Sequence, residues 1–134
     1  MPARQGDALA RNFRERKPWV DYQARITGMG NGPTFIMEWT FNGIEFDGFV
    51  SSQCLLQEAK AGYDQFFDEW GEFRYDFQRD IFIDMMTDAI RQNVAAVPKP
   101  PVQLRWYFQE LVSYRYMQKI LQRATPEIEV LFQP

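Results

Sequence analysis

The sequence predicts an α/β fold in which a mixed β-sheet core is flanked by helices, formed as a single domain over residues 1–134. In the first half, short stretches alternate apolar and polar residues, a period typical of half-buried strands. Further along, apolar residues recur at the spacing of a helix, and strand-like and helix-like stretches then alternate to the end. Such an order favours helices packed on a sheet. A hydrophobic content of 46% is sufficient for a packed core.

The N-terminal part is predicted to contain one helix and one strand. Residues 7–17 are mostly polar with two apolar residues four apart, which predicts a short helix that Pro18 stops. Residues 20–26 alternate between apolar and polar, which predicts a half-buried strand. The glycine-rich stretch 28–33 predicts a hairpin connection, because it lacks the lysine and the following helix of a phosphate-binding loop.

Three strands are predicted next, over residues 34–41, 44–50 and 53–60. Asn42-Gly43, between the first two, is the strongest hairpin signal in the chain, because both residue types accept the positive φ angles of a two-residue turn. A further turn is expected before the third strand, so that neighbouring strands in the sequence pair with each other.

The second half is predicted to begin with one long helix. Apolar residues follow helical spacing from Phe66 to about Ala96, with Gly71 as the candidate break. A strand, a helix and a final strand follow, at 102–108, 110–123 and 127–132. The last residues, 129–134, resemble a protease-cleavage tag of recombinant proteins, and the alternation before them favours a native strand that runs into such a tag.

The absence of histidine narrows the chemistry available to the chain. It excludes Ser-His-Asp and Cys-His nucleophilic catalysis, histidine-dependent nuclease mechanisms and the usual catalytic zinc sites. An enzyme built from this sequence must work with carboxylates, lysine, tyrosine or metal-activated water.

The charge distribution is uneven. A net charge of −3 and a pI near 5.0 argue against a nucleic-acid-binding protein, since such proteins usually carry a basic surface. Acidic residues, however, concentrate between Asp64 and Asp88, and basic residues gather toward the two ends: Arg4, Arg11, Arg14, Arg16, Lys17, Arg105, Arg115, Lys119 and Arg123. The segregation weakens the objection from net charge.

Targeting signals are missing from the sequence. No apolar stretch approaches the roughly 20 residues that a membrane-spanning helix needs, so no membrane association is expected. The first residues lack the apolar run of a secretory signal peptide. The single cysteine, Cys54, cannot form an internal disulfide, so nothing ties the fold to an oxidising compartment.

One set of charged residues is suited to hydrolytic chemistry. Asp47 lies in the second predicted strand, and Glu58 and Lys60 lie two residues apart in the third, where they project from the same face. If the two strands form a hairpin, the two carboxylates and the ammonium group converge. Two carboxylates suit Mg²⁺, which prefers oxygen ligands and retains waters. Such an ion lowers the pKa of water and neutralises charge on a phosphate.

Glu38 adds a third carboxylate on the preceding predicted strand, and it completes the cluster if the strand register allows. Charged residues in apolar strands usually have a partner or a role. The alternative is an ordinary polar sheet face with Lys60 in a surface ion pair, because short patterns of this kind recur by chance.

Three stretches resemble a known family. They are GIEFDGF at 43–49, LLQEAK at 55–60 and YDQF at 63–66. Together they resemble the fifth restriction-endonuclease-fold toxin family of the PD-(D/E)xK superfamily. These are nuclease modules of bacterial polymorphic toxins, many of them delivered by type VI secretion. The likeness extends from about Trp19 to Val130, and the acidic pI departs from what DNA binding leads one to expect.

The resemblance implies a restriction-endonuclease-like fold and a function. Asp47 and Glu58 would bind Mg²⁺ or Mn²⁺, Lys60 would be the catalytic lysine, and Glu38 an additional acidic residue. The chain would be a DNase that acts in the cytoplasm of a rival cell as the C-terminal module of a larger secreted effector. Its partners would be DNA, a cognate immunity protein and delivery proteins bound through regions outside this chain.

Two other functions remain open at this point. Phosphodiester chemistry alone does not separate DNA from RNA as the substrate. A non-enzymatic immunity or adaptor module could instead present an acidic helix face to a partner. That face would consist of residues mostly four apart: Asp64, Asp68, Glu69, Glu72, Asp76, Asp80, Asp84 and Asp88.

Overall fold

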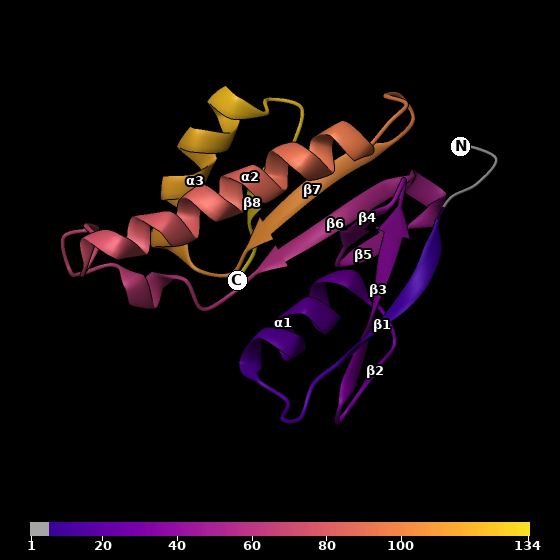
Figure 1. The fold of residues 1–134 in the computed structure, drawn as a ribbon, viewed down its shortest axis with the longest axis horizontal. Coiled ribbons are helices and arrows are strands. Elements are labelled where there is room, and N and C mark those ends of the chain that lie inside the picture. Colours follow the sequence, from indigo (N-terminus) through magenta and orange to yellow (C-terminus); the bar gives the residue numbers. More distant parts are fainter. Residues whose placement is uncertain (1–5) are drawn as a thin grey trace.

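The computed structural model describes residues 6–134 as two four-stranded sheets with three helices (Figure 1). The predicted α/β class, with a mixed sheet flanked by helices, is confirmed. Among residues 6–134, no helix is both long enough and apolar enough to cross a membrane. Arg4, from the predicted N-terminal basic cluster, lies outside the described residues.

The first sheet is built around β3 (Phe35–Phe41), the longest of its strands. It pairs antiparallel with β1 (Asp7–Asn12), β2 (Asn31–Gly32) and β4 (Ile44–Phe46). The hairpin predicted at Asn42-Gly43 is confirmed. The φ angles there are 51° and 78°, the positive values that a tight two-residue turn requires.

The second sheet has the strand order β5-β6-β7-β8. Its members are β5 (Gly48–Val50), β6 (Leu55–Lys60), β7 (Gln103–Phe108) and β8 (Glu129–Phe132). The pair β5–β6 is antiparallel, whereas β6–β7 and β7–β8 are parallel. Each parallel pair is connected through a helix: α2 (Arg79–Ala95) links β6 to β7, and α3 (Leu111–Ala124) links β7 to β8. Parallel strands require such crossovers.

A single residue, Asp47, separates β4 from β5, so the chain passes there from one sheet into the other. The predicted strand at 44–50 is therefore two short strands. The turn after β5 is a 3₁₀ turn at Ser51–Gln53, and β6 then begins at Leu55, two residues later than predicted.

The helices cover the two faces of the second sheet (Figure 1). Thr27 of α1 (Pro18–Thr27) and Gln57 of β6 both border Gly48, whereas Gln92 of α2 bonds to Glu58. Gln57 and Glu58 are consecutive in a strand and point to opposite faces. The main apolar core lies on the face covered by α2 and α3, and includes Leu56, Phe82, Met85, Leu104, Trp106, Phe108, Met117 and Leu121.

The N-terminal prediction is wrong in both elements. The predicted helix at 7–17 contains strand β1, which is exposed along its length and is held by hydrogen bonds to β3. The predicted strand at 20–26 lies within α1. Pro18 begins this helix rather than stopping one, because proline at the first helical position loses no hydrogen bond and has the right φ.

The long helix predicted from Phe66 to Ala96 is wrong in its first half, since α2 begins only at Arg79. The preceding segment contains 3₁₀ turns at Asp64–Phe66 and Asp76–Gln78. Between them, the Asp68 carboxylate accepts hydrogen bonds from two backbone N–H groups, a turn that competes with helix formation. The continuous acidic helix face is wrong for the same reason: only Asp80, Asp84 and Asp88 lie on α2.

The last three elements are confirmed as β7, α3 and β8. The N-terminus of α3 is capped from a distance. The Asp64 carboxylate accepts hydrogen bonds from the backbone N–H groups of Val112 and Ser113, and Glu110 accepts one from the N–H of Asp64. This reciprocal pair anchors the segment that follows Lys60.

Gly48 is predicted to be essential for the packing of α1 on β5. A Cβ atom at this position would lie 2.6 Å from the Thr27 Cβ and 2.9 Å from the Gln57 Oε1. Gly48→Ala should therefore lower the free energy of unfolding by about 1–3 kcal/mol, as overpacking usually does. Gly30→Ala is the control, because its Cβ would meet Met37 at an ordinary 3.6 Å. Urea denaturation compares them, and equal stabilities would contradict the packing at Gly48.

Candidate active site

The placement of Asp47 follows from strand pairing. Gly48 lies opposite Gln57 in the antiparallel pair β5–β6, and continuing this register by one residue puts Asp47 opposite Glu58. The Asp47 carboxylate accepts a hydrogen bond from the backbone N–H of Ala59 through Oδ2, at 2.8 Å. Within residues 6–134, no protein donor bonds to its other oxygen, Oδ1. Asp47 is only 8% exposed.

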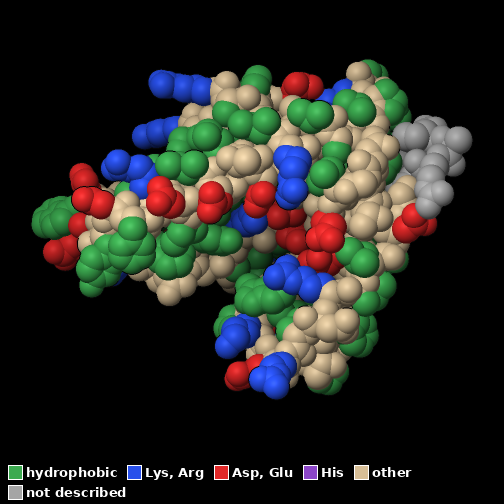
Figure 2. Space-filling view, in the orientation of Figure 1, with side chains coloured by type: hydrophobic (Ala, Val, Ile, Leu, Met, Phe, Trp, Pro, Cys, Tyr) green, Lys and Arg blue, Asp and Glu red, His purple; other side chains and the backbone are tan. Residues whose placement is uncertain are grey.

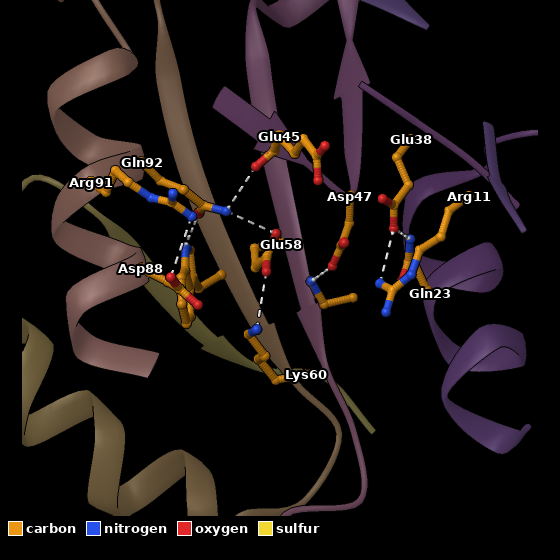
Figure 3. A network of polar contacts seen from close by, with 12 residues as sticks. Arg11, Gln23, Glu38, Glu45, Asp47, Glu58, Lys60, Asp88, Arg91 and Gln92 are labelled. Atoms are coloured by element: carbon orange, nitrogen blue, oxygen red, sulfur yellow. Dashed lines mark hydrogen bonds and ion pairs between the residues drawn. The ribbon is translucent and has the colours of Figure 1, made fainter. Parts of the chain in front are cut away.

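Glu58 and Lys60 project from the same face of β6, as their spacing predicts. The Lys60 Nζ lies 3.0 Å from the Glu58 Oε2. It also lies 5.0 Å from the centre of the Trp106 ring, a favourable position for a cation over an aromatic face. Trp106 is opposite Glu58 in the parallel pair β6–β7 and is completely buried. Figure 3 shows Glu58 between Lys60 and Gln92.

These three residues line one pocket of about 250 Å³. Figure 2 shows acidic and basic side chains gathered where the surface is hollowed between the part that carries α1 and the part that carries α2. One wall comes from β1 and α1, and the opposite wall from the end of β6 and the residues after it. The lining residues are Arg11, Trp19, Gln23, Asp47, Glu58, Ala59, Lys60, Ala61 and Tyr63.

Glu38 lies beside this pocket and is engaged with other partners. It is 4% exposed and accepts a hydrogen bond of 2.7 Å from the amide of Gln23. The guanidinium of Arg11 lies 3.5 Å from the same oxygen. Across residues 6–134, no three Cys, Asp or Glu side chains are arranged to hold a metal ion together. Glu38 therefore does not complete a three-carboxylate centre, and its catalytic role stays a prediction.

The electrostatics of the pocket reflect crowded carboxylates. Burial, followed by the nearby charge of Glu58, raises the pKa of Asp47 well above its ordinary value, although Lys60 opposes the shift. Burial alone would lower the pKa of Lys60, but the carboxylates of Glu58 and Asp47 and the Tyr63 hydroxyl outweigh it and raise that pKa. Lys60 thus keeps its positive charge at neutral pH.

Several residues of the site were missed in the sequence. Gln92 bonds to Glu58 and Trp106 from α2, and Arg11 and Gln23 form the wall around Glu38. A signal for Gln92 exists: it falls on the buried stripe of α2 with Met85, Ala89 and Ala95, where a polar residue is unusual. No local signal exists for Arg11, because its position depends on the pairing of β1 with β3.

Comparison with known protein families matches residues 19–111 to the family described as restriction endonuclease fold toxin 5. The chain belongs to this family. The matched span contains Asp47, Glu58 and Lys60, and it leaves out β1 and β8. A comparison with curated proteins found no match. Membership makes the chain a restriction-endonuclease-fold toxin, and this fold implies a nuclease that hydrolyses phosphodiester bonds.

Nucleases with this fold usually use divalent metal ions, and the residues present fit such an ion. Asp47 and Glu58 are hard oxygen ligands, and the Oδ1 of Asp47 has no protein donor among the described residues 6–134. The pocket lining holds two carboxylates, Asp47 and Glu58, and two cationic side chains, Arg11 and Lys60, and Glu38 beside the pocket adds a third carboxylate. The unbalanced negative charge suits a cation. Two protein carboxylates are sufficient for Mg²⁺, which keeps several waters.

The raised pKa of Asp47 predicts how the metal-free protein responds to pH. A folded pKa above the unfolded one means that ionisation opposes folding, so stability falls as pH rises from about 4 through the folded pKa. Asp47→Asn removes the ionisable carboxyl group and therefore removes this loss of stability at high pH. In EDTA at pH 8, we expect the variant to be more stable than the parent by about 1 kcal/mol, and this gain should disappear below pH 4.

Asp84→Asn, at an exposed position of α2, provides the control for this measurement. Its stability should follow that of the parent within about 0.5 kcal/mol at every pH. Urea titrations from pH 3.5 to 8 are sufficient for the comparison. A lower stability of Asp47→Asn across this range would show that the charged acceptor strengthens the Ala59 hydrogen bond by more than the burial of the charge costs.

Proposed function

We propose that this chain is a metal-dependent DNase toxin, which hydrolyses phosphodiester bonds of DNA in a rival bacterium. The observation that carries the proposal is the convergence of Asp47, Glu58 and Lys60 in one pocket within a restriction-endonuclease fold. Nothing in the pocket offers a histidine or a nucleophilic cysteine, so hydrolysis by activated water is the chemistry that fits.

The side chains have distinct roles in this proposal. A bound Mg²⁺ or Mn²⁺ would supply an acidified water and neutralise charge on the scissile phosphate. Asp47 and Glu58 would hold the ion. Lys60 brings a fixed positive charge, which stabilises the negative charge that grows on the phosphate in the transition state. Its raised pKa makes it a donor of hydrogen bonds and charge rather than a proton acceptor.

Arg11 and Trp19 form the wall where the nucleic acid would enter. The side chain of Arg11 is 54% exposed, and its guanidinium lies 4.6 Å from the centre of the Trp19 ring. This stacking and the contact with Glu38 hold the charged group at the pocket mouth. Arg11 is thereby placed to bind a backbone phosphate next to the one that is cut. A local cation of this kind makes the overall acidic charge compatible with a DNA substrate.

A toxin of this activity requires protection of the cell that makes it. We propose a cognate inhibitor, a small immunity protein that covers the pocket and its Arg11 rim or holds the domain in an inactive shape. We also propose that the chain is the C-terminal module of a larger secreted effector. Delivery proteins would act on other parts of that effector, and the nuclease would work in the cytoplasm of the target cell.

The competing functions differ in their support. The adaptor reading rested on one acidic helix face, and the separation of the acidic residues between α2 and the segment before it removes that support. RNA remains a candidate substrate, since the pocket chemistry is the same for both nucleic acids. Plasmid DNA and a structured RNA of similar length, tested side by side with Mg²⁺, separate the two.

Lys60→Met and Asp47→Asn should both impair cleavage, but in different ways. Methionine keeps most of the aliphatic stem and removes the ammonium, so we expect plasmid cleavage to fall about 100-fold or more at every Mg²⁺ concentration. Asp47→Asn removes a negative ligand, so high Mg²⁺ should restore part of its activity. A magnesium titration of plasmid cleavage distinguishes the two responses.

Lys119→Met, at an exposed position of α3 outside the pocket, is the matched control and should cut like the parent. Circular dichroism and urea titration establish that each variant is folded. If folded Lys60→Met and Asp47→Asn both cut the plasmid at the parent's rate, the cluster is only a polar sheet face and the DNase proposal fails.

The inhibitor can be sought with Lys60→Met as bait, because this variant should be harmless to the cell that makes it. From the native host, we expect the bait to retain a dedicated small protein that blocks plasmid cleavage by the parent. Arg11→Glu should weaken the complex about 10-fold or more if the inhibitor covers the pocket mouth. Recovery of no such protein would count against the toxin–inhibitor pair.

A further inference from the structure

Gln92 lies inside the molecule at the junction of α2, β6 and β7. It is 4% exposed, and its side chain makes three hydrogen bonds. The amide nitrogen donates to the Glu58 Oε1 at 3.0 Å and to the backbone carbonyl of Glu45 at 3.2 Å. The amide oxygen accepts the indole N–H of Trp106 at 2.9 Å. Figure 3 shows Gln92 reaching from α2 to Glu58 and to the backbone of Glu45.

The indole fixes the direction of this amide. The Trp106 Nε1 can only donate a hydrogen bond, so it must face the oxygen of Gln92. The NH₂ group of Gln92 is then turned toward Glu58. In a flipped amide, the NH₂ group would face the indole N–H of Trp106, and the amide oxygen would face the Glu58 carboxylate, so neither contact could form a hydrogen bond. Trp106 thus determines that Glu58 meets a hydrogen-bond donor.

The same contacts leave Glu58 with one orientation. Gln92 holds Oε1 and Lys60 holds Oε2, while the like charge of Asp47 acts to push the carboxylate away. Without the amide, one end of the carboxylate would lose the only neutral side chain that donates to it among residues 6–134, and it could rotate away from Asp47. The two ligand groups would then no longer be held facing the same space.

We propose that Gln92 is a positioning residue that, locked by Trp106, holds Glu58 in the orientation that binds the divalent cation together with Asp47. This rests on the proposed function and extends it to a residue outside the Asp47–Glu58–Lys60 cluster. Partners that orient a metal ligand commonly contribute a factor of about 10 to 100 in metal affinity. In this proposal, Trp106 on β7 orients Gln92 on α2, and Gln92 in turn orients Glu58 on β6. The contribution to metal affinity therefore requires both Gln92 and Trp106.

The test measures Mn²⁺ binding by the loss of the free-ion electron paramagnetic resonance signal, with no nucleic acid present. Gln92→Met preserves the length of the side chain and removes both polar atoms. It should weaken Mn²⁺ binding about 10-fold or more. Trp106→Phe keeps an aromatic ring beneath Lys60 and removes the N–H, so it should weaken binding by a smaller factor. If the indole acts through Gln92, the double variant should bind like Gln92→Met alone.

Gln78→Met is the matched control for a buried glutamine. Gln78 is 7% exposed and accepts a hydrogen bond from the backbone N–H of Tyr75, outside the pocket. It should become less stable to urea without any change in Mn²⁺ affinity. If Gln92 only formed structural hydrogen bonds, Gln92→Met would likewise lower the stability to urea and leave the Mn²⁺ affinity unchanged. An unchanged Mn²⁺ affinity of Gln92→Met would therefore overturn the proposal.

The outcomes separate this proposal from the DNase proposal. If Gln92→Met does not fold, the Trp106→Phe variant decides the matter. An unchanged Mn²⁺ affinity of Trp106→Phe overturns the positioning role of Gln92, and a weakened Mn²⁺ affinity supports it. If the parent binds Mn²⁺ but cuts no DNA, the DNase proposal fails, whereas weaker binding by Gln92→Met still supports the positioning role. If the parent cuts DNA and Gln92→Met matches it in Mn²⁺ affinity, only the positioning role fails. A parent that binds no Mn²⁺ overturns the positioning role.

Discussion

The passage of the chain from one sheet to the other at Asp47 is the constraint on which the site depends. β4 pairs with β3 and β5 pairs with β6, so Asp47 belongs to neither strand and lies where the chain passes between the two sheets. Its carboxylate turns to the backbone N–H of Ala59, which the interruption leaves accessible. Because β6 pairs with β5 in a fixed register, Glu58 must then face Asp47. The proximity of the two carboxylates is thus a property of the backbone.

Placing two buried carboxylates together opposes folding, and the rest of the site compensates for it. Lys60 supplies an opposite charge to Glu58, and Gln92 and Trp106 supply a directed hydrogen bond. Glu38, a third carboxylate, is satisfied by Gln23 and Arg11. Each carboxylate has its own partners, yet one oxygen of Asp47 accepts no hydrogen bond from any residue that the structure describes. A site in which protein groups neutralised every buried carboxylate would be more stable, but it would not attract a cation.

The sequence was informative wherever a local pattern decides the structure. The Asn42-Gly43 turn, the strand of Trp106 and the spacing of Glu58 and Lys60 could all be predicted, because turn chemistry and the two-residue period act over a few residues. The N-terminal elements could not be predicted. β1 exists through hydrogen bonds to β3, more than twenty residues away, and Pro18 is equally compatible with stopping a helix or starting one. Contacts between distant parts of the chain, rather than local sequence preferences, determine both the strand β1 and the helix that begins at Pro18.

The same limit applies to the site. Asp47, Glu58 and Lys60 could be named because charged residues within apolar strands are conspicuous. Gln92 carries a local signal, a polar residue on the buried stripe of α2, but its partners follow only from the packing of α2 on β6. Arg11 carries no such signal, since its place depends on the pairing of β1 with β3. Glu38 lies near enough to Asp47 to raise its pKa, but its carboxylate is bound by Gln23, and its role in the site stays a prediction.

Arg11 in the pocket wall and the carboxylates of the pocket lie on strands that differ in how they are held in the fold. Arg11 stands on an exposed edge strand that lies outside the family-matched residues 19–111, whereas the carboxylates stand on strands within them. An edge strand is attached by one ladder of backbone hydrogen bonds, which are indifferent to side-chain identity. The residues of β1 can therefore be exchanged without rebuilding the sheets beneath. Under the proposed function, substrate recognition by Arg11 and hydrolysis by the carboxylate cluster would therefore lie on separable parts of the fold, so a new target preference could arise while the hydrolytic residues stay the same.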